Sequence, residues 1–205
     1  MALIVLDMDD TLYLERDYAR SGFDAVGALL GEEDFSTRAM ALLDAGGRGD
    51  IFDRLAPAPD RVKAMIAAYR THTPRIALAP DAERLLARLP VAALITDGTQ
   101  VTQRNKIAAL GLGHLDPVIV TDELGVEFRK PHPRAFEAVM QRHGTPPGGY
   151  VYVGDNPAKD FFAPRRLGWR SFRIRRRGGL HERAEPASAD HAPDAEIDSL
   201  DELQP

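Results

Sequence analysis

Three aspartates follow the first apolar stretch of the chain within four residues. Asp7, Asp9 and Asp10 lie in the segment VLDMDDTL, directly after what reads as a buried strand. Carboxylates packed this closely repel one another, and burying one without a partner is unfavourable. The pattern therefore predicts a positive charge at this point. Beside a cation, Asp7 can attack phosphorus, and Asp9, two residues later, can transfer the proton that such a reaction needs.

Polar residues also mark the ends of later apolar runs. Thr96 and Asp97 end the second run, Asp122 follows the third, and Asp155 ends the fourth. In a doubly wound sheet the carboxyl ends of the strands share one edge, where ligands bind. Several carboxylates at that edge need a cation to neutralise them, and Mg²⁺ prefers oxygen ligands. We therefore expect Mg²⁺ as the cofactor.

A phosphoryl group at this edge would also need hydrogen-bond donors and a fixed positive charge. Thr96 and the backbone around Asp97 and Gly98 can supply the donors. Lys130, in the proline-flanked segment RKPHP, can supply the charge.

Short apolar runs rich in Val and Ile recur along the chain and are typical of strands buried on both faces of a parallel sheet. They cover residues 2–7, 91–98, 116–123, 150–156 and 170–175. Helical patterns that end near glycine separate the later runs. This alternation predicts an α/β fold with a Rossmann-like, doubly wound, mainly parallel sheet.

One interval breaks the alternation. Residues 13–79 contain amphipathic helical stretches and no convincing strand, and the interval is much longer than the dozen or so residues that a crossover needs. We therefore expect a small helical subdomain inserted after the first strand, with residues 1–12 and 80–205 forming the catalytic core.

Composition limits the possible functions. The net charge is −5 and the chain has no cysteine. These values argue against general nucleic-acid binding and exclude disulfides and thiolate chemistry. Neither a signal peptide nor an apolar run of about 20 residues is present, so we expect a cytoplasmic protein with no membrane partner.

Four segments in order, DMDDTLY, LITDGT, RKPHP and GDNPAKD, resemble the motifs of the haloacid dehalogenase superfamily. The resemblance spans residues 3–174 and includes a helical cap after the first motif. It implies a Mg²⁺-dependent phosphatase that forms an aspartyl-phosphate intermediate. Asp9 distinguishes this chain from the dehalogenases of the superfamily, which lack an aspartate two residues after the nucleophile.

The resemblance assigns the main roles at the reacting centre. Asp7 would be the nucleophile and a metal ligand. Asp9 would be the general acid and base, and its backbone carbonyl would bind the metal. Thr96 would bind the phosphoryl group and Lys130 would neutralise charge beside it.

The last motif supplies the remaining roles. Asp155 would be a direct metal ligand. Asp160 would hold a metal-bound water or orient Lys130, and Asn156 would support the metal ligands from behind.

Some alternatives stay open. A phosphomutase of the same superfamily shares these residues, and a non-catalytic binding protein could keep the fold. The expected partner is a small phosphorylated metabolite, a sugar phosphate or a nucleoside monophosphate, acted on by a monomer or a homodimer. Arg70, His72 and Arg75, where the inserted segment returns to the core, either contact the substrate or form a solvated helix end.

Overall fold

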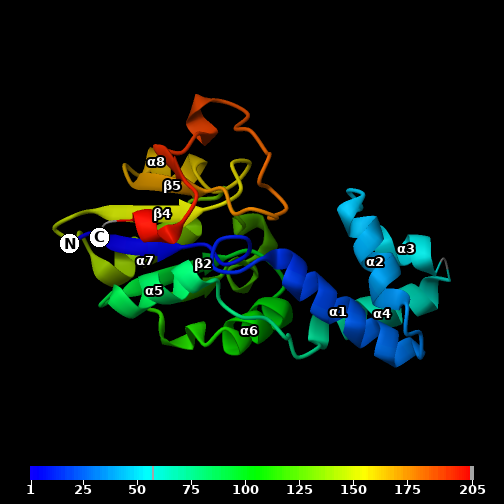
Figure 1. Ribbon diagram of the computed structural model, residues 1–205. Coiled ribbons are helices and arrows are strands. Elements are labelled where there is room, and N and C mark those ends of the chain that lie inside the picture. Colours follow the sequence, from blue (N-terminus) through cyan, green and yellow to red (C-terminus); the bar gives the residue numbers. More distant parts are fainter. Residues whose placement is uncertain (57, 204–205) are drawn as a thin grey trace. The chain divides into compact units, whose positions relative to one another are not determined.

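The computed structural model describes residues 1–56 and 58–203. The chain divides into two compact units, Met1–Glu15 with Ala77–Pro205 and Arg16–Ile76. Figure 1 shows the first unit as a sheet with helices and the second unit as helices alone. The insertion predicted at residues 13–79 extends three residues beyond the second unit at each end.

The first unit contains a parallel sheet, with six strands among the described residues, in the order β3-β2-β1-β4-β5-β6. The strands are β1 (Leu3–Leu6), β2 (Ala92–Thr96), β3 (Val118–Val120), β4 (Tyr150–Gly154), β5 (Arg170–Ile174) and β6 (Ala195–Ile197). The fold class predicted from the sequence is confirmed. Each of the first five strands lies inside one of the predicted apolar runs.

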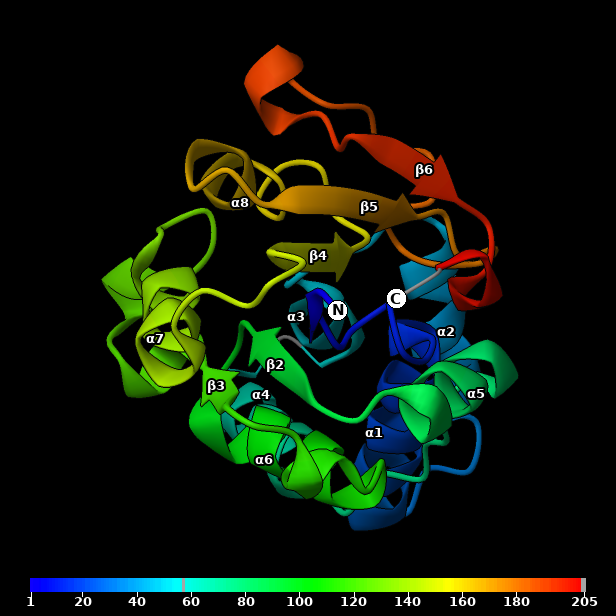
Figure 2. The same cartoon turned by 90° about the vertical axis from the view of Figure 1, so that its left-hand side faces the viewer.

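Helices cover both faces of this sheet. Figure 2 shows α7 (Arg134–His143) and α8 (Phe162–Arg166) on one side, and α5 (Pro80–Arg88) and α6 (Gln100–Ala109) on the other. Because both faces are covered, every residue of the central strands β1, β2 and β4 is buried. This explains why those strands are continuous apolar runs with no polar alternation.

Short 3-10 helices complete the first unit. They are η1 (Leu112–His114), η2 (Thr121–Glu123), η3 (Val126–Phe128), η4 (Ala189–His191) and η5 (Leu200–Glu202). An aromatic core lies between the sheet and α7, where Phe136 packs edge-to-face against Tyr152 and Trp169.

The strand register decides which polar residues meet. Leu6 pairs with Leu94 on one side and with Val153 on the other. The chain therefore leaves β1, β2 and β4 at neighbouring points of the same edge. Asp7 and Asp155, each the first residue after its strand, emerge side by side.

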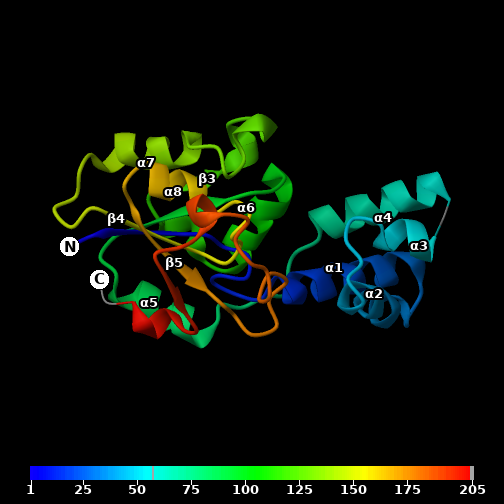
Figure 3. The same cartoon turned by 90° about the horizontal axis from the view of Figure 1, so that it is seen from above.

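The second unit consists of α1 (Glu15–Leu30, whose first residue belongs to the first unit), α2 (Phe35–Asp44), α3 (Ile51–Leu55) and α4 (Pro59–Thr71). Figure 3 shows these helices from above. Their apolar faces share a core that includes Phe23, Phe35 and Met65. Among the described residues, no strand belongs to this unit.

His72 and Arg75, two of the residues singled out at the return of the insertion, contact side chains of the helical unit. His72 contacts the hydroxyl of Ser21 at 3.1 Å and packs against the ring of Tyr18. Arg75 donates a hydrogen bond of 2.7 Å to Asp24. Their proposed contact with substrate stays a prediction, as does that of Arg70.

Across residues 1–56 and 58–203, no helix combines the length and apolar character needed to cross a bilayer.

Candidate active site

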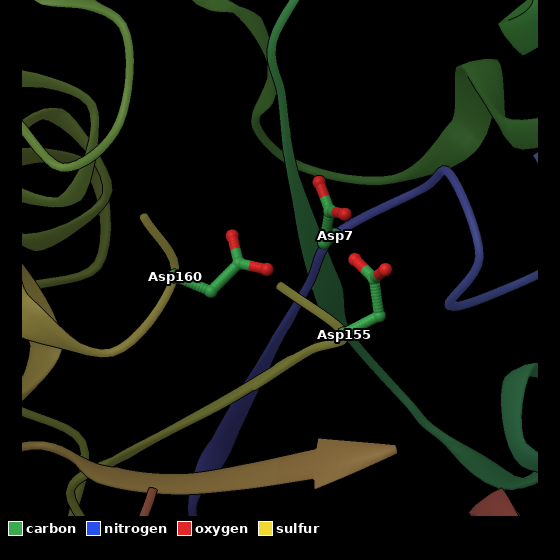
Figure 4. A group of neighbouring side chains, drawn as sticks. All are labelled: Asp7, Asp155 and Asp160. Carbon is green, nitrogen blue, oxygen red and sulfur yellow. The ribbon is translucent and has the colours of Figure 1, made fainter. Parts of the chain in front are cut away.

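Three buried carboxylates converge at the carboxyl edge of the sheet. Asp7, Asp155 and Asp160 each offer an oxygen, and these oxygens lie within 4.8 Å of one another. Figure 4 shows their carboxyl groups directed into a common space, with Asp7 following the strand β1. Their exposed fractions are 2%, 5% and 0%, so water screens their mutual repulsion poorly.

Lys130 supplies positive charge to this group. Its Nζ lies 2.6 Å from Oδ1 of Asp7 and 2.7 Å from Oδ1 of Asp160, and it also donates to the hydroxyl of Tyr152 at 3.0 Å. All of these side chains are buried. The lysine therefore joins the first and last motifs through one ammonium group, and its pKa is raised well above its usual value by Asp160 and Asp7 despite burial.

Asp97 holds the segment that carries Lys130. Its Oδ1 accepts hydrogen bonds from the backbone N–H of Lys130 at 3.1 Å and from the hydroxyl of Thr121 at 2.8 Å. Its Oδ2 accepts from Nζ of Lys159 at 3.1 Å. The side chain of Asp97 thus has a positioning role besides any contribution of the backbone around it.

One lysine does not neutralise the group. Burial raises the pKa of Asp7 to about 6, even though Lys130 lowers it. Burial, with the neighbouring charges of Asp160 and Asp7, raises the pKa of Asp155 well above its usual range. Burial also disfavours the charge of Asp160, but Lys130 and Lys159 outweigh burial and lower its pKa.

The donor set fits a hard divalent cation. Oδ2 of Asp155 is buried and has no hydrogen-bond partner among the described residues, whereas Asp160 has Lys130 on Oδ1 and the backbone N–H of Asn156 on Oδ2, at 2.8 Å. A buried carboxylate oxygen without a donor is unfavourable unless a cation or a proton sits against it. Because both oxygens of Asp160 already accept hydrogen bonds from protein donors, Asp155 and Asp7 are the carboxylates best placed to bind a metal directly, and Asp160 anchors Lys130.

Asp9 lies in a second polar cluster beside the first. Its Oδ1 accepts a hydrogen bond of 2.7 Å from Nζ of Lys106 and another from the hydroxyl of Tyr13. Its Oδ2 accepts from Nε2 of Gln103 at 3.0 Å. Burial raises the pKa of Asp9, but Lys106 and these hydrogen bonds outweigh burial and lower it.

Thr96 joins the second cluster through Gln103. The amide Nε2 of Gln103 donates to Oγ1 of Thr96 at 2.6 Å, and both side chains are buried. The backbone turns sharply just after Thr96, where Gly98 has φ +136 and a Cβ would lie 3.0 Å from the side chain of Gln103. Glycine therefore allows the strand end and α6 to approach closely.

Asp10 has a structural role, as a turn-forming aspartate would. Its Oδ1 accepts from the backbone N–H of Glu15, at the start of α1, and its Oδ2 accepts from the backbone N–H of Leu180 at 2.6 Å. Arg176 adds a hydrogen bond of 2.6 Å to the carbonyl of Thr11. The loop after β5 thus holds the loop after β1 in place.

Most residues predicted for the site are brought together. Asp7, Asp155, Asp160, Lys130 and Asp97 share one cluster, and Asp9 shares the other with Thr96. Asp122 is separate, because it forms an ion pair with Arg129 at 2.5 Å.

Sequence reasoning missed Gln103, Lys106, Lys159 and Glu15. A partial signal existed for two of them, because Gln103 and Lys106 share the buried face of α6 with Ile107 at helical spacing. Lysine is rarely buried without a partner, so its place on that face indicates a buried anion nearby. No local pattern marked Glu15, whose pKa is raised to about 7 by burial and by Asp9.

Comparison with protein families matches residues 1–168 to the haloacid dehalogenase-like hydrolases. The match includes the four motifs that carry the site. The chain belongs to this hydrolase family.

Curated relatives of this haloacid dehalogenase-like chain include two phosphatases. A phosphoserine phosphatase of Thermus thermophilus is 31% identical over 91% of this chain and 70% of its own length. A glyceraldehyde 3-phosphate phosphatase of Methanocaldococcus jannaschii is 30% identical over 98% of this chain and 94% of its own length.

A solved structure shares the fold of this chain. It is the HAD-hydrolase YfnB of Bacillus subtilis bound to magnesium, with a TM-score of 0.68, 16% identity, and coverage of 98% of this chain and 96% of that chain. At this identity the likeness concerns the fold.

Proposed function

We propose that this protein is a Mg²⁺-dependent phosphatase that hydrolyses a small phosphorylated metabolite through an aspartyl-phosphate on Asp7. The observation that carries the proposal is the Lys130 ammonium bound to Asp7 at 2.6 Å, beside an Asp155 oxygen that has no donor in the described part of the chain. A nucleophile, a fixed cation and a metal position thus lie within a few ångströms of one another. Two phosphatases among the relatives in the same hydrolase family support the proposal.

In the first step, an oxygen of Asp7 forms a bond to phosphorus while the bond from phosphorus to the ester oxygen breaks. The protonated form of Asp9 gives its proton to the departing oxygen, which leaves as an alcohol. The ammonium of Lys130 compensates the charge on the phosphoryl oxygens, and Thr96 with the backbone of Asp97 and Gly98 binds them.

In the second step, water attacks the phosphorus of the aspartyl-phosphate and gives its proton to Asp9. The bond between phosphorus and Asp7 breaks, inorganic phosphate leaves, and both carboxyl groups return to their starting states. Asp7, Asp155 and the backbone carbonyl of Asp9 would hold Mg²⁺, which would supply further positive charge to the phosphoryl oxygens.

The substrate class follows from the relatives rather than from the site. Phosphoserine and glyceraldehyde 3-phosphate, named in those relatives, are small primary phosphate esters. We propose a metabolite of this size, with sugar phosphates and nucleoside monophosphates as further candidates. The helical unit is proposed to be the cap of the family and to select the non-phosphate part of the substrate.

The test is phosphate release from a panel of such esters, including p-nitrophenyl phosphate, with Mg²⁺ and with a chelator. We expect release only with the metal, and we expect Asp7→Asn to lower turnover by at least about a thousandfold while the protein stays folded. Substantial turnover by Asp7→Asn would exclude the mechanism. Transfer of phosphate between positions of a sugar, without net release, would indicate a phosphomutase instead.

A further inference from the structure

Two polar side chains on the buried face of α6 are directed at Asp9. Gln103 and Lys106 lie three residues apart on this helix, so both side chains point the same way. Their exposed fractions are 1% and 3%. Burying a lysine and a glutamine in place of apolar residues is unfavourable unless each contributes hydrogen bonds there.

Both oxygens of Asp9 are engaged by this face. Lys106 donates to Oδ1 at 2.7 Å, and Gln103 donates to Oδ2 at 3.0 Å. A carboxylate bound by one donor can still rotate about its Cβ–Cγ bond. With a separate donor on each oxygen, that rotation would break one hydrogen bond, so the plane of the carboxylate is fixed.

Gln103 also donates a hydrogen bond to Thr96, the residue proposed to bind the phosphoryl group. Its Nε2 carries two hydrogens, and it contacts Oδ2 of Asp9 as well as Oγ1 of Thr96, which lies 2.6 Å away. One amide group therefore sets the spacing between the residue that transfers the proton and a residue that binds the phosphoryl group.

We propose that Gln103 and Lys106 are positioning residues for Asp9, which fix the plane of its carboxyl group relative to the leaving oxygen. The inference rests on the proposed function, since it needs Asp9 to act as the acid. Neither side chain is assigned to substrate contact. A carboxyl group held in one orientation keeps its oxygen aligned with the leaving oxygen, which matters most for a leaving group that is a strong base.

A pair of matched substrates isolates this role. Phenyl phosphate and p-nitrophenyl phosphate have similar size and the same phosphoryl group. Phenolate is a strong base that leaves slowly without a proton, whereas p-nitrophenolate leaves readily by itself. A defect in Asp9 should therefore lower kcat/KM for phenyl phosphate far more than kcat/KM for p-nitrophenyl phosphate.

We expect Lys106→Met to lower kcat/KM about a hundredfold for phenyl phosphate and less than about tenfold for p-nitrophenyl phosphate. Asp9→Asn should show the same selective loss, and adding Lys106→Met to Asp9→Asn should cause little further loss, because the two residues act as one unit. The matched control is Arg104→Met, which removes one positive charge from the same helix but from an exposed ion pair with Glu123. It should leave both substrates nearly unaffected.

The inference would be overturned if Lys106→Met lowered kcat/KM equally for the two esters. It would also be overturned if Lys106→Met lowered kcat/KM for phenyl phosphate as much in the Asp9→Asn variant as in wild type. If Lys106→Met does not fold, Gln103→Leu decides the matter, because it changes no charge. An effect through Thr96 lowers kcat/KM for both esters alike, so the loss on phenyl phosphate should exceed the loss on p-nitrophenyl phosphate by about tenfold. Wild-type protein that cleaves neither ester, nor any ester of the panel, would count against the proposed function itself. Wild-type protein that cleaves both, with no selectivity in the variants, would reject only the positioning role.

Discussion

At the scale of single residues, Asp155 and Asp160 have the same side chain, five residues apart, in different electrostatic surroundings. Lys130 and a backbone N–H engage Asp160, whereas one oxygen of Asp155 has no donor within the described residues. The pKa of Asp160 is lowered and that of Asp155 is raised. Neutralising Asp160 should therefore destabilise the fold, whereas neutralising Asp155 should not.

The first prediction concerns Asp155→Asn. Removing a charge that burial and its neighbours disfavour should leave the metal-free protein at least as stable as wild type near neutral pH. It should also remove a proposed metal ligand, so Mg²⁺ should no longer raise the Tm. Thermal unfolding with Mg²⁺ and with a chelator measures both effects. Asp160→Asn is the control and should destabilise the metal-free protein, because it takes a partner from Lys130.

The second prediction concerns the buried ammonium. Lys130→Met leaves Asp7 and Asp160 without their common cation, and breaking such a buried pair from one side costs about 3–5 kcal/mol. Urea unfolding in the presence of a chelator should show this loss. The double variant Lys130→Met, Asp160→Asn should recover part of the stability, since it removes one of the stranded charges. A loss below about 1 kcal/mol would mean that the pair contributes as little as a surface ion pair.

At the scale of elements, the site depends on how closely the end of β2 approaches α6. Gly98 provides this approach, with a positive φ and with the Gln103 side chain 3.0 Å from the position of a Cβ. The two elements are adjacent in sequence, so the contact needs only a short turn. The contact between Gly98 and Gln103 sets the orientation of the Gln103 side chain. Because Gln103 donates to Asp9, this contact also affects the orientation of Asp9.

The third prediction is that Gly98→Ala destabilises the protein by about 1–3 kcal/mol, through backbone strain and displacement of Gln103. Its kcat should fall as well, because Gln103 would no longer hold Asp9 and Thr96 together. Gly113→Ala is the matched control, since a Cβ there meets nothing within 4 Å. Urea unfolding and steady-state assays of both variants make the comparison. A neutral Gly98→Ala would show that the strand end can shift without affecting α6.

At the scale of the whole molecule, the carboxyl edge has an excess of negative charge that only a cation or protons can neutralise. Burial raises the pKa of Asp7 to about 6 in the absence of metal. A group whose pKa is higher in the folded state stabilises the fold while it is protonated, and this stabilisation is lost as the pH rises through the folded value. The metal-free protein should thus lose stability as the pH rises through about 6, and Mg²⁺ should restore it.

The fourth prediction follows from this competition between protons and metal. Asp7 is almost fully ionised at about pH 7.5 but only about one-tenth ionised at about pH 5. Because Mg²⁺ binds the ionised form, a fixed concentration of Mg²⁺ should raise the Tm more at the higher pH. In the Asp155→Asn variant, Mg²⁺ should not raise the Tm at either pH. An equal Tm increase at both pH values would indicate a metal site that does not involve these carboxylates.

Local sequence was sufficient for the first five strands and for the sheet class. A strand covered on both faces must be apolar throughout, so β1, β2 and β4 are visible as short runs of Val, Ile, Leu and Ala. Residues just beyond those runs must lie at one edge of a parallel sheet. For that reason the sequence alone places Asp7, Thr96 and Asp155 at one edge of the sheet.

Tertiary structure alone decided which charges pair at that edge. Lys106 donates a hydrogen bond to Asp9, which is 97 residues away in sequence. Lys130 donates to Asp160 as well as to Asp7. The periodicity of α6 shows that Gln103 and Lys106 share a face, but it does not show what that face meets. Hydrogen bonds and ion pairs act only over a few ångströms, so their partners are determined by how the elements pack.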